Sequence, residues 1–205
     1  SRSEQIKIST YIPFRKCILV ENAVKYLPAF NDRSDNDKTI VTVGQIRSQK
    51  GPIEFASIAR KVRSKMPDLT FRWVGDGEAA SKKILLDAGV EVTGWVNKKQ
   101  VIDYLTSSTL YLSTARWEGM PVSIIETHYA RLPVVASRCS GNVDVVAHGE
   151  TGWLFDSDFE ASELVLTTVA NPSRTSKIVD HAYKEAQRKF SSERYVRDMV
   201  SLIVK

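Results

Sequence analysis

The chain of 205 residues has the length of one α/β domain with short appendages. Hydrophobic residues make up 42% of it and charged residues 26%, which excludes wholesale disorder, and no apolar run approaches the roughly 18–20 residues that cross a bilayer. The net charge of +5 fits an anionic partner, but the basic residues are scattered and form no nucleic-acid-binding motif. Two cysteines, Cys17 and Cys139, exclude a disulfide framework and favour a reducing cytoplasm.

Short apolar strands dominate the pattern from residue 39 onward. Before that point, Cys17–Val20 is a strand candidate and the polar residues 31–38 are the best linker candidate. After the linker, β-branched and apolar runs bounded by turn residues predict six strands. These lie at Thr39–Val43, Thr70–Val74, Val90–Thr93, Leu110–Ser113, Val134–Ala136 and Gly152–Phe155.

The helices between these strands have recognisable first and last residues. Pro52 opens the first helix, where its missing N–H costs nothing, and Gly89 ends the second. Asn97, with Gln100 three residues later, is a good N-cap for the third. Pro121 opens the fourth, which is predicted to reach about residue 130.

Strands alternating with helices indicate βαβ crossovers and hence a parallel sheet. Residues 160–205 are predicted as helices broken near Pro172 and restarted at the N-cap candidate Ser191. The sequence therefore predicts an α/β, Rossmann-like, doubly wound sheet of about six parallel strands with helices on both faces. Because ligands bind outside the carboxyl ends of such strands, the loops of interest are 44–51, 75–78, 94–97, 114–121 and 137–143.

The loop after the first strand, residues 44–51, can bind phosphate. It begins at Gly44, contains Arg47 and Lys50, and leads into a helix N-terminus, so an ammonium and free backbone N–H groups come together. The loop is neither a Walker A motif nor Gly-x-Gly-x-x-Gly. The second absence disfavours a nicotinamide-dependent oxidoreductase.

Two carboxylates eight residues apart give the strongest signal. Glu118 follows the fourth predicted strand, and Glu126 lies about a turn and a half into the next helix, on or beside its apolar side. A carboxylate in such surroundings is rarely buried without partners, which disfavours a purely structural role. An anion near this helix start would meet the free N–H groups of Gly119, Met120, Val122 and Ser123.

These loops carry a resemblance to a known family. The short motifs, in chain order, are Val43-Gly44 with Lys50-Gly51, Val74-Gly75-Asp76-Gly77, Val92-Thr93-Gly94-Trp95-Val96, Ser113 before Glu118, Glu118-Gly119 with Glu126, Leu132-Pro133-Val134-Val135-Ala136-Ser137, and Gly149-x-Thr151-Gly152. Each is weak alone, but their order and spacing over about 80% of the chain are specific. The chain resembles the C-terminal, donor-binding half of a GT-B-fold, family 4 retaining glycosyltransferase.

The resemblance implies roles for individual residues. It assigns catalysis to Lys50, through the donor diphosphate, and to Glu118, through hydroxyls of the transferred sugar. It assigns the ribose hydroxyls to Glu126. The other donor-binding residues that it implies are Gly44, Arg47, Gly75, Trp95, Val96, Gly119, Met120, Pro121 and Val122.

One position departs from the family pattern. Gln45 stands where the family commonly has an arginine, which removes one cation from the diphosphate site. Arg47, two residues later in the same loop, is the candidate that would compensate.

The resemblance also implies a domain organisation and partners. Residues 1–37 would connect to an absent N-terminal acceptor domain, 38–190 would bind the nucleotide sugar, and 191–205 would form a C-terminal helix. The donor would be a UDP- or GDP-linked sugar, and the acceptor a glycan or lipid-linked glycan, with no metal ion or other cofactor. We expect the isolated chain to be inactive and the enzyme to be cytoplasmic, with peripheral contact to the cytoplasmic membrane face.

Two other functions fit the same residues. One is a degenerate, non-catalytic nucleotide-sugar-binding module, for which Gln45 is the only indication. The other is a GT-B-fold nucleotide-sugar epimerase, which would act without an acceptor.

The aromatic and histidine side chains allow further interpretations. Trp73, Trp117 and Trp153 are predicted in the core, whereas Trp95 would lie on the loop beside the base. His128 follows Glu126 on the same helix and is interpreted as structural or exposed rather than chemical.

Overall fold

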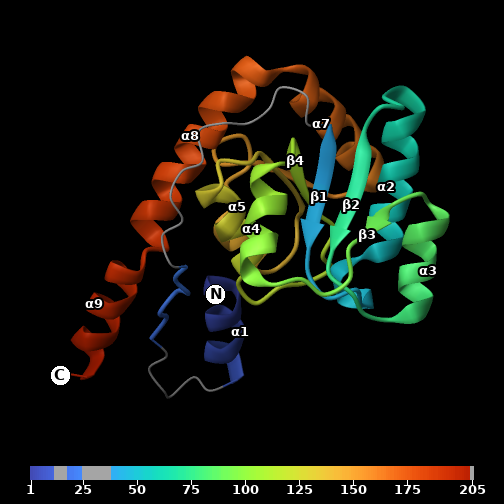
Figure 1. Cartoon of the computed structure of the whole chain (residues 1–205). Coiled ribbons are helices and arrows are strands. Elements are labelled where there is room, and N and C mark those ends of the chain that lie inside the picture. Colours follow the sequence, from blue (N-terminus) through green and yellow to red (C-terminus); the bar gives the residue numbers. More distant parts are fainter. Residues whose placement is uncertain (12–17, 25–37, 204–205) are drawn as a thin grey trace.

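Six parallel strands form one sheet with helices on both sides (Figure 1). The computed structural model describes residues 1–11, 18–24 and 38–203. Across the sheet the order is β3-β2-β1-β4-β5-β6, and β1 pairs with β2 from Thr39 opposite Thr70 to Val43 opposite Val74. This confirms the predicted fold class. The strands are β1 Thr39–Val43, β2 Thr70–Val74, β3 Glu91–Val92, β4 Leu110–Ser113, β5 Val134–Ser137 and β6 Trp153–Phe155.

Helices follow most of the strands and complete the two outer layers. A 3-10 turn, η1 (Ser48–Lys50), precedes the first of the crossover helices. Three long helices end the chain, and α9 extends away from the sheet (Figure 1). The helices are α1 Arg2–Tyr11, α2 Pro52–Lys65, α3 Ala79–Asp87, α4 Lys98–Thr106, α5 Val122–Tyr129, α6 Asn142–Val145, α7 Asp158–Ala170, α8 Pro172–Lys189 and α9 Ser192–Ile203.

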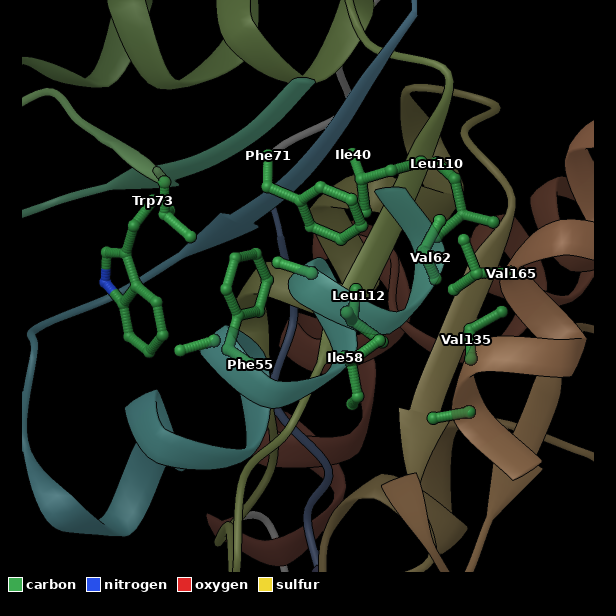
Figure 2. Packing of buried hydrophobic residues seen from close by; sticks show 14 of the residues in the cluster. Ile40, Phe55, Ile58, Val62, Phe71, Trp73, Leu110, Leu112, Val135 and Val165 are labelled. Carbon is green, nitrogen blue, oxygen red and sulfur yellow. The ribbon is translucent and has the colours of Figure 1, made fainter. Parts of the chain in front are cut away.

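Neighbouring residues of β1 supply two separate cores, as the alternation of side chains in a strand requires. Ile40 belongs to the cluster that α2 and α7 cover, in which Phe55 meets Phe71 and Trp73 edge to face (Figure 2). Val41 belongs to the opposite cluster, which α5 and α8 cover. Both faces of β1 are therefore buried, which explains why its sequence is apolar without alternation.

The expected end signals of several helices are present. Asn97 and Gln100 form a reciprocal capping box at the start of α4. Gly89 follows α3 with a left-handed φ of 68°, and the hydroxyl of Ser191 accepts a hydrogen bond from Arg194 N at 3.3 Å. These local predictions are confirmed because they depend only on residues within one turn of each other.

Other expectations are wrong or untested. Ile18–Val20 form no strand, since no neighbouring strand supplies the hydrogen bonds that a strand needs. Cys17 and most of the predicted linker 31–38 lie outside the described residues. Trp117 is 54% exposed and not in the core, because it sits in the loop after β4. The sequence analysis also missed α1 and α6, which are polar or short.

The connector and C-terminal segments meet beyond the sheet. Val24 bridges to Ser191, and the Arg194 guanidinium donates to the carbonyls of Glu21 at 2.8 Å and Asn22 at 2.9 Å. Whether residues 1–37 act as a connector and 191–205 as a separate unit stays a prediction. Among the described helices, none is both long enough and apolar enough to span a bilayer.

His128 lies inside the domain rather than on its surface. It is only 2% exposed, on α5, and burial lowers its pKa to about 4, although a hydrogen bond to the backbone of Thr151 opposes the shift. The folded protein therefore holds a neutral imidazole, whereas the unfolded chain would protonate it near pH 6.5.

Acid should therefore destabilise the fold through His128. Below pH 6.5 the unfolded state binds a proton on His128, whereas the folded state binds it only near pH 4. The contribution of His128 to the free energy of unfolding is therefore complete above pH 6.5 and declines toward pH 4. We expect His128 to account for a loss of about 3 kcal/mol over this range. Urea unfolding at pH 7 and pH 4.5 measures it, with His128→Gln losing less stability than the wild type. The exposed His181→Gln is the control, and equal losses in wild type and His128→Gln would contradict the assignment.

Candidate functional site

The site lies where β1 and β4 are neighbours in the sheet. The chain leaves β1 toward α2 on one face and leaves β4 toward α5 on the other, which is the change of direction at which ligands bind to sheets of this kind. The predicted loops after β1, β2, β3, β4 and β5 all end at this carboxyl edge, as a parallel sheet requires.

The loop after β1 is held against the loop after β4 by backbone contacts. Gly51 has a left-handed φ of 66°, and a Cβ added to it would lie 2.1 Å from the carbonyl oxygen of Thr114. The Thr114 hydroxyl donates to the carbonyls of both Lys50 and Gly51 at 2.9 Å. Gln49 accepts from Arg116 N at 2.8 Å and donates to the carbonyl of Trp117 at 2.8 Å. Only glycine fits at position 51, and this close approach fixes the position of the Lys50 backbone beside the loop after β4.

Lys50 and Glu118 connect the loop after β1 to the loop after β4. The Lys50 ammonium lies 2.6 Å from Glu118 Oε1, and the side chains are only 19% and 11% exposed. The aliphatic part of Lys50 passes over Gly44, where an added Cβ would lie 3.1 Å from Lys50 Cε. Partial burial makes this charge-assisted hydrogen bond stronger than a surface pair.

Free backbone donors lie beside this ion pair. Glu118 N donates to the carbonyl of Ser140 at 2.8 Å, and Gly141 packs tightly against Glu118. Four N–H groups just before α5 or in its first turn donate to no acceptor within the described part of the chain. They belong to Gly119, Met120, Val122 and Ser123.

A carboxylate of the chain already lies near these donors. A Cβ added to Gly119 would be 3.0 Å from Oε1 of Glu4, in α1. Lys50 contacts Glu118, and the free N–H groups begin at the next residue, so the predicted cation and N–H groups lie together. Its chemistry suits a negatively charged group.

Glu126 is buried one helical turn beyond Val122. It is 5% exposed, and Oε1 forms an ion pair with the ammonium of Lys98. Lys98 is the first residue of α4, positioned by the capping box at Asn97, and its own side chain remains 58% exposed. Sequence analysis missed Lys98 as a residue of the site, although its place in the first turn of α4, the helix after β3, could have indicated it. The buried carboxylate thus has a partner that can be reached from solvent.

The turns after β2 and β3 complete the edge. Gly44 N donates to the carbonyl of Val74 at 3.0 Å, and a Cβ added to Gly75 would lie 2.2 Å from the carbonyl oxygen of Gly44. Gly75 also bridges to Gly94, the residue before Trp95. The three turns therefore form one connected rim.

Some of the predicted donor-binding residues lie together and others lie apart. The residues after β1 and β4 are brought together, as described above. Trp95 is 69% exposed on the rim, whereas Val96 packs against the cluster under α5. The side chain of Arg47 is exposed and forms no hydrogen bond or ion pair with the described residues, so its compensation for Gln45 stays a prediction.

The remaining members of the predicted set have structural partners. Met120 Sδ accepts a hydrogen bond from Asn22 N at 3.1 Å. Pro121 is buried at the N-cap of α5. Among the described residues, no three His, Cys, Asp or Glu side chains are grouped so that they could hold a metal ion.

Solved structures that share the fold of this chain include several glycosyltransferases. Staphylococcus aureus TarM, as a mutant in complex with fondaparinux, α-GlcNAc-glycerol and UDP, superposes with a TM-score of 0.89 at 20% identity, over 98% of this chain and 42% of TarM. The sucrose-phosphate synthase of Thermosynechococcus elongatus gives a TM-score of 0.87 at 17% identity, over 99% of this chain and 56% of that one. At these identities the likeness establishes the fold.

Sequence relatives extend the likeness beyond the fold. The chain is 32% identical over 153 residues to the 2-deoxystreptamine N-acetyl-D-glucosaminyltransferase of Niallia circulans, covering 72% of this chain and 36% of that protein. It is 28% identical over 172 residues to the Escherichia coli UDP-Gal:α-D-GlcNAc-diphosphoundecaprenol α-1,3-galactosyltransferase, covering 71% and 43%. The chain thus spans less than half the length of either relative. A sequence profile of glycosyl transferases group 1 matches residues 26–185, and the chain belongs to this family.

Proposed function

We propose that this chain is the donor-binding half of a retaining glycosyltransferase of family 4. It would bind a nucleoside diphosphate sugar, UDP- or GDP-linked, and present the sugar to a glycan or lipid-linked glycan. The observation that carries the proposal is the shielded Lys50–Glu118 ion pair beside the free N–H groups at the start of α5. TarM and Anabaena HepE, both crystallised with UDP, share the fold and support a nucleotide ligand.

The diphosphate would bind between Lys50 and the start of α5. As the bond between the sugar and the diphosphate breaks, negative charge accumulates on the leaving diphosphate oxygen. The Lys50 ammonium and the N–H groups of Gly119 and Met120 would stabilise that charge without moving, which is electrostatic catalysis. This arrangement suits a reaction that needs no metal ion.

The two carboxylates would orient the rest of the donor. Glu118 would accept hydrogen bonds from hydroxyls of the transferred sugar, next to the diphosphate. Glu126 would accept from the ribose hydroxyls, and Lys98, which is largely exposed, would move aside or share Oε1. The base would then lie over the rim formed by Gly75 and the exposed Trp95.

Sugar transfer would need more than these residues. Among the described residues, α1 lies against the free N–H groups through Glu4, and a single helix of ten residues is too small to form an acceptor domain. We therefore propose that an N-terminal domain, joined through residues 1–37, supplies the acceptor, in a cytoplasmic enzyme in peripheral contact with the membrane face.

The first test is binding without transfer. We expect UDP or GDP to raise the melting temperature of the 205-residue chain, because a ligand at one hundred times its Kd stabilises by about 2.7 kcal/mol. ADP and the corresponding nucleotide sugars complete the screen. The same chain should transfer no sugar to glycan acceptors, so transfer by the chain alone would contradict its role as a half-enzyme. Conversion of free nucleotide sugar to its epimer would favour the epimerase instead.

Lys50→Ala should weaken diphosphate binding far more than nucleoside binding. Loss of a charge-assisted contact costs roughly 1.5–3 kcal/mol, so we expect the Kd for UDP or GDP to rise about 10- to 150-fold. Calorimetric titration with the diphosphate and with its nucleoside measures the difference. Lys99→Ala, an exposed lysine paired with Asp103, is the matched control. Equal losses for both ligands would exclude a phosphate role for Lys50.

Glu126→Gln should remove the preference for ribose. A carboxylate can accept from two vicinal hydroxyls, and the amide keeps the shape but loses the charge and one acceptor. We expect the wild type to bind a ribonucleoside diphosphate more tightly than its 2′,3′-dideoxy analogue, and the variant to lose roughly 1.5–3 kcal/mol of that difference. Glu91→Gln, at an exposed carboxylate of β3, serves as control. A variant that keeps the full preference would show that Glu126 is not the ribose ligand.

A further inference from the structure

Lys98 pairs with the buried carboxylate of Glu126 from a position that stays open to solvent. It begins α4, which lies beside α5 (Figure 1), and its ammonium contacts Glu126 Oε1. The Lys98 side chain is 58% exposed, whereas that of Glu126 is only 7% exposed. An ammonium has three N–H donors, and Lys98 forms no second hydrogen bond in the described part of the chain. Two donors therefore remain unused beside the carboxylate.

The carboxylate of Glu126 also has an unused oxygen. Its Oε2 accepts no hydrogen bond from the described residues and still reaches solvent. A ligand at this place would meet a free acceptor oxygen and an ammonium with free donors, held next to each other. A hydroxyl group has one proton to donate and two lone pairs that accept. It is therefore the neutral group that can use both members of the pair at once.

The local sequence fixes the Lys98 backbone close to the rim of the site. Asn97 and Gln100 cap the start of α4 through two hydrogen bonds of 2.9 Å. Trp95, which is exposed on the rim, precedes Lys98 by three residues, a distance of at most about 11 Å along the chain. A base that lies over Trp95 would therefore bring its own ribose toward Lys98 and Glu126.

Lys98 would stay on Glu126 when a ribose binds. If it turned away toward a phosphate, a buried carboxylate would lose its partner, which is strongly unfavourable. A ribose hydroxyl is neutral and cannot replace the charge of the ammonium. The ion pair is therefore kept, and the two unused N–H groups of Lys98 are available to the hydroxyls that Glu126 accepts from.

We propose that Lys98 is a ribose-binding residue and that, together with Glu126, it makes the site selective for ribonucleotides over deoxyribonucleotides. This inference rests on the proposed donor-binding function. The ribose hydroxyls would donate to Glu126 and accept from the Lys98 ammonium, so each hydroxyl would be held from both sides. A deoxyribose would exclude water from the pair without supplying these hydrogen bonds, and unpaired polar groups are costly.

The preference for ribose tests the proposal in the 205-residue chain. Calorimetric titration compares UDP or GDP, whichever binds more tightly, with its 2′,3′-dideoxy analogue. Lys98→Met is made in the wild type and in Glu126→Gln, where no buried carboxylate loses its partner and the amide oxygen can still accept from Lys98. In both backgrounds we expect Lys98→Met to reduce the ratio of the two Kd values about fivefold or more. Lys99→Met, at the adjacent exposed lysine that pairs with Asp103, should leave the ratio unchanged.

Three results would overturn the proposal. A reduced preference in the wild-type background alone would mean that Lys98 only positions Glu126. An equal loss of affinity for the nucleotide and its dideoxy analogue would mean that Lys98 contacts a phosphate. An unchanged preference in both backgrounds would mean that Lys98 contacts no part of the ribose.

Failure of the proposed donor-binding function would give a different result. The wild-type chain would then bind neither UDP nor GDP, or would bind the ribonucleotide and its dideoxy analogue equally. Either outcome appears before any variant is made, and the inference about Lys98 falls with it. A wild-type preference for ribose that Lys98→Met leaves intact in both backgrounds would overturn the inference alone.

Discussion

Direct contact between backbones at the carboxyl edge of the sheet is the constraint on which the site depends. A Cβ at Gly51 would collide with the Thr114 carbonyl, and one at Gly75 with the Gly44 carbonyl. The turns after β1, β2 and β4 can therefore approach one another only through glycine. Since Lys50 and Glu118 both lie in these turns, their 2.6 Å contact follows from how closely the backbones pack.

The sheet could be predicted from the sequence because its signals are local and repeated. Apolar runs of three to five residues, capping residues and glycine stops recur at βαβ spacing, and each depends on neighbours in sequence. The convergence of Lys50 and Glu118 could also be predicted, since parallel strands bring their carboxyl ends to one edge. The failures are of another kind. Ile18–Val20 have strand-like composition but no neighbouring strand, and Trp117 has core-like chemistry but lies in an exposed loop.

Lys98 and His128 show what long-range packing adds. The sequence gives no periodic reason for Lys98 to pair with Glu126, because their elements come together only through the order β3-β2-β1-β4 and the way that α4 and α5 lie on it. His128 is buried because α8 covers α5, a contact between segments more than fifty residues apart. One short helix thus carries a buried carboxylate that is paired with Lys98 and, two residues later, a buried neutral imidazole.

The Lys50–Glu118 pair also bears on how the proposed donor site would select its ligand. A lysine that is four-fifths shielded from water needs a nearby negative charge, and Glu118 supplies it in the free protein. A diphosphate could take over that role, because an ammonium has three N–H donors and an incoming anion preserves the charge balance. Glu118 would then be released to accept hydrogen bonds from the sugar. A neutral sugar carries no charge that could replace the Glu118 carboxylate beside Lys50, so the ion pair would stay intact. Selection of a nucleotide-linked sugar over a free one would therefore begin with this ion pair, before any contact with base or ribose is made.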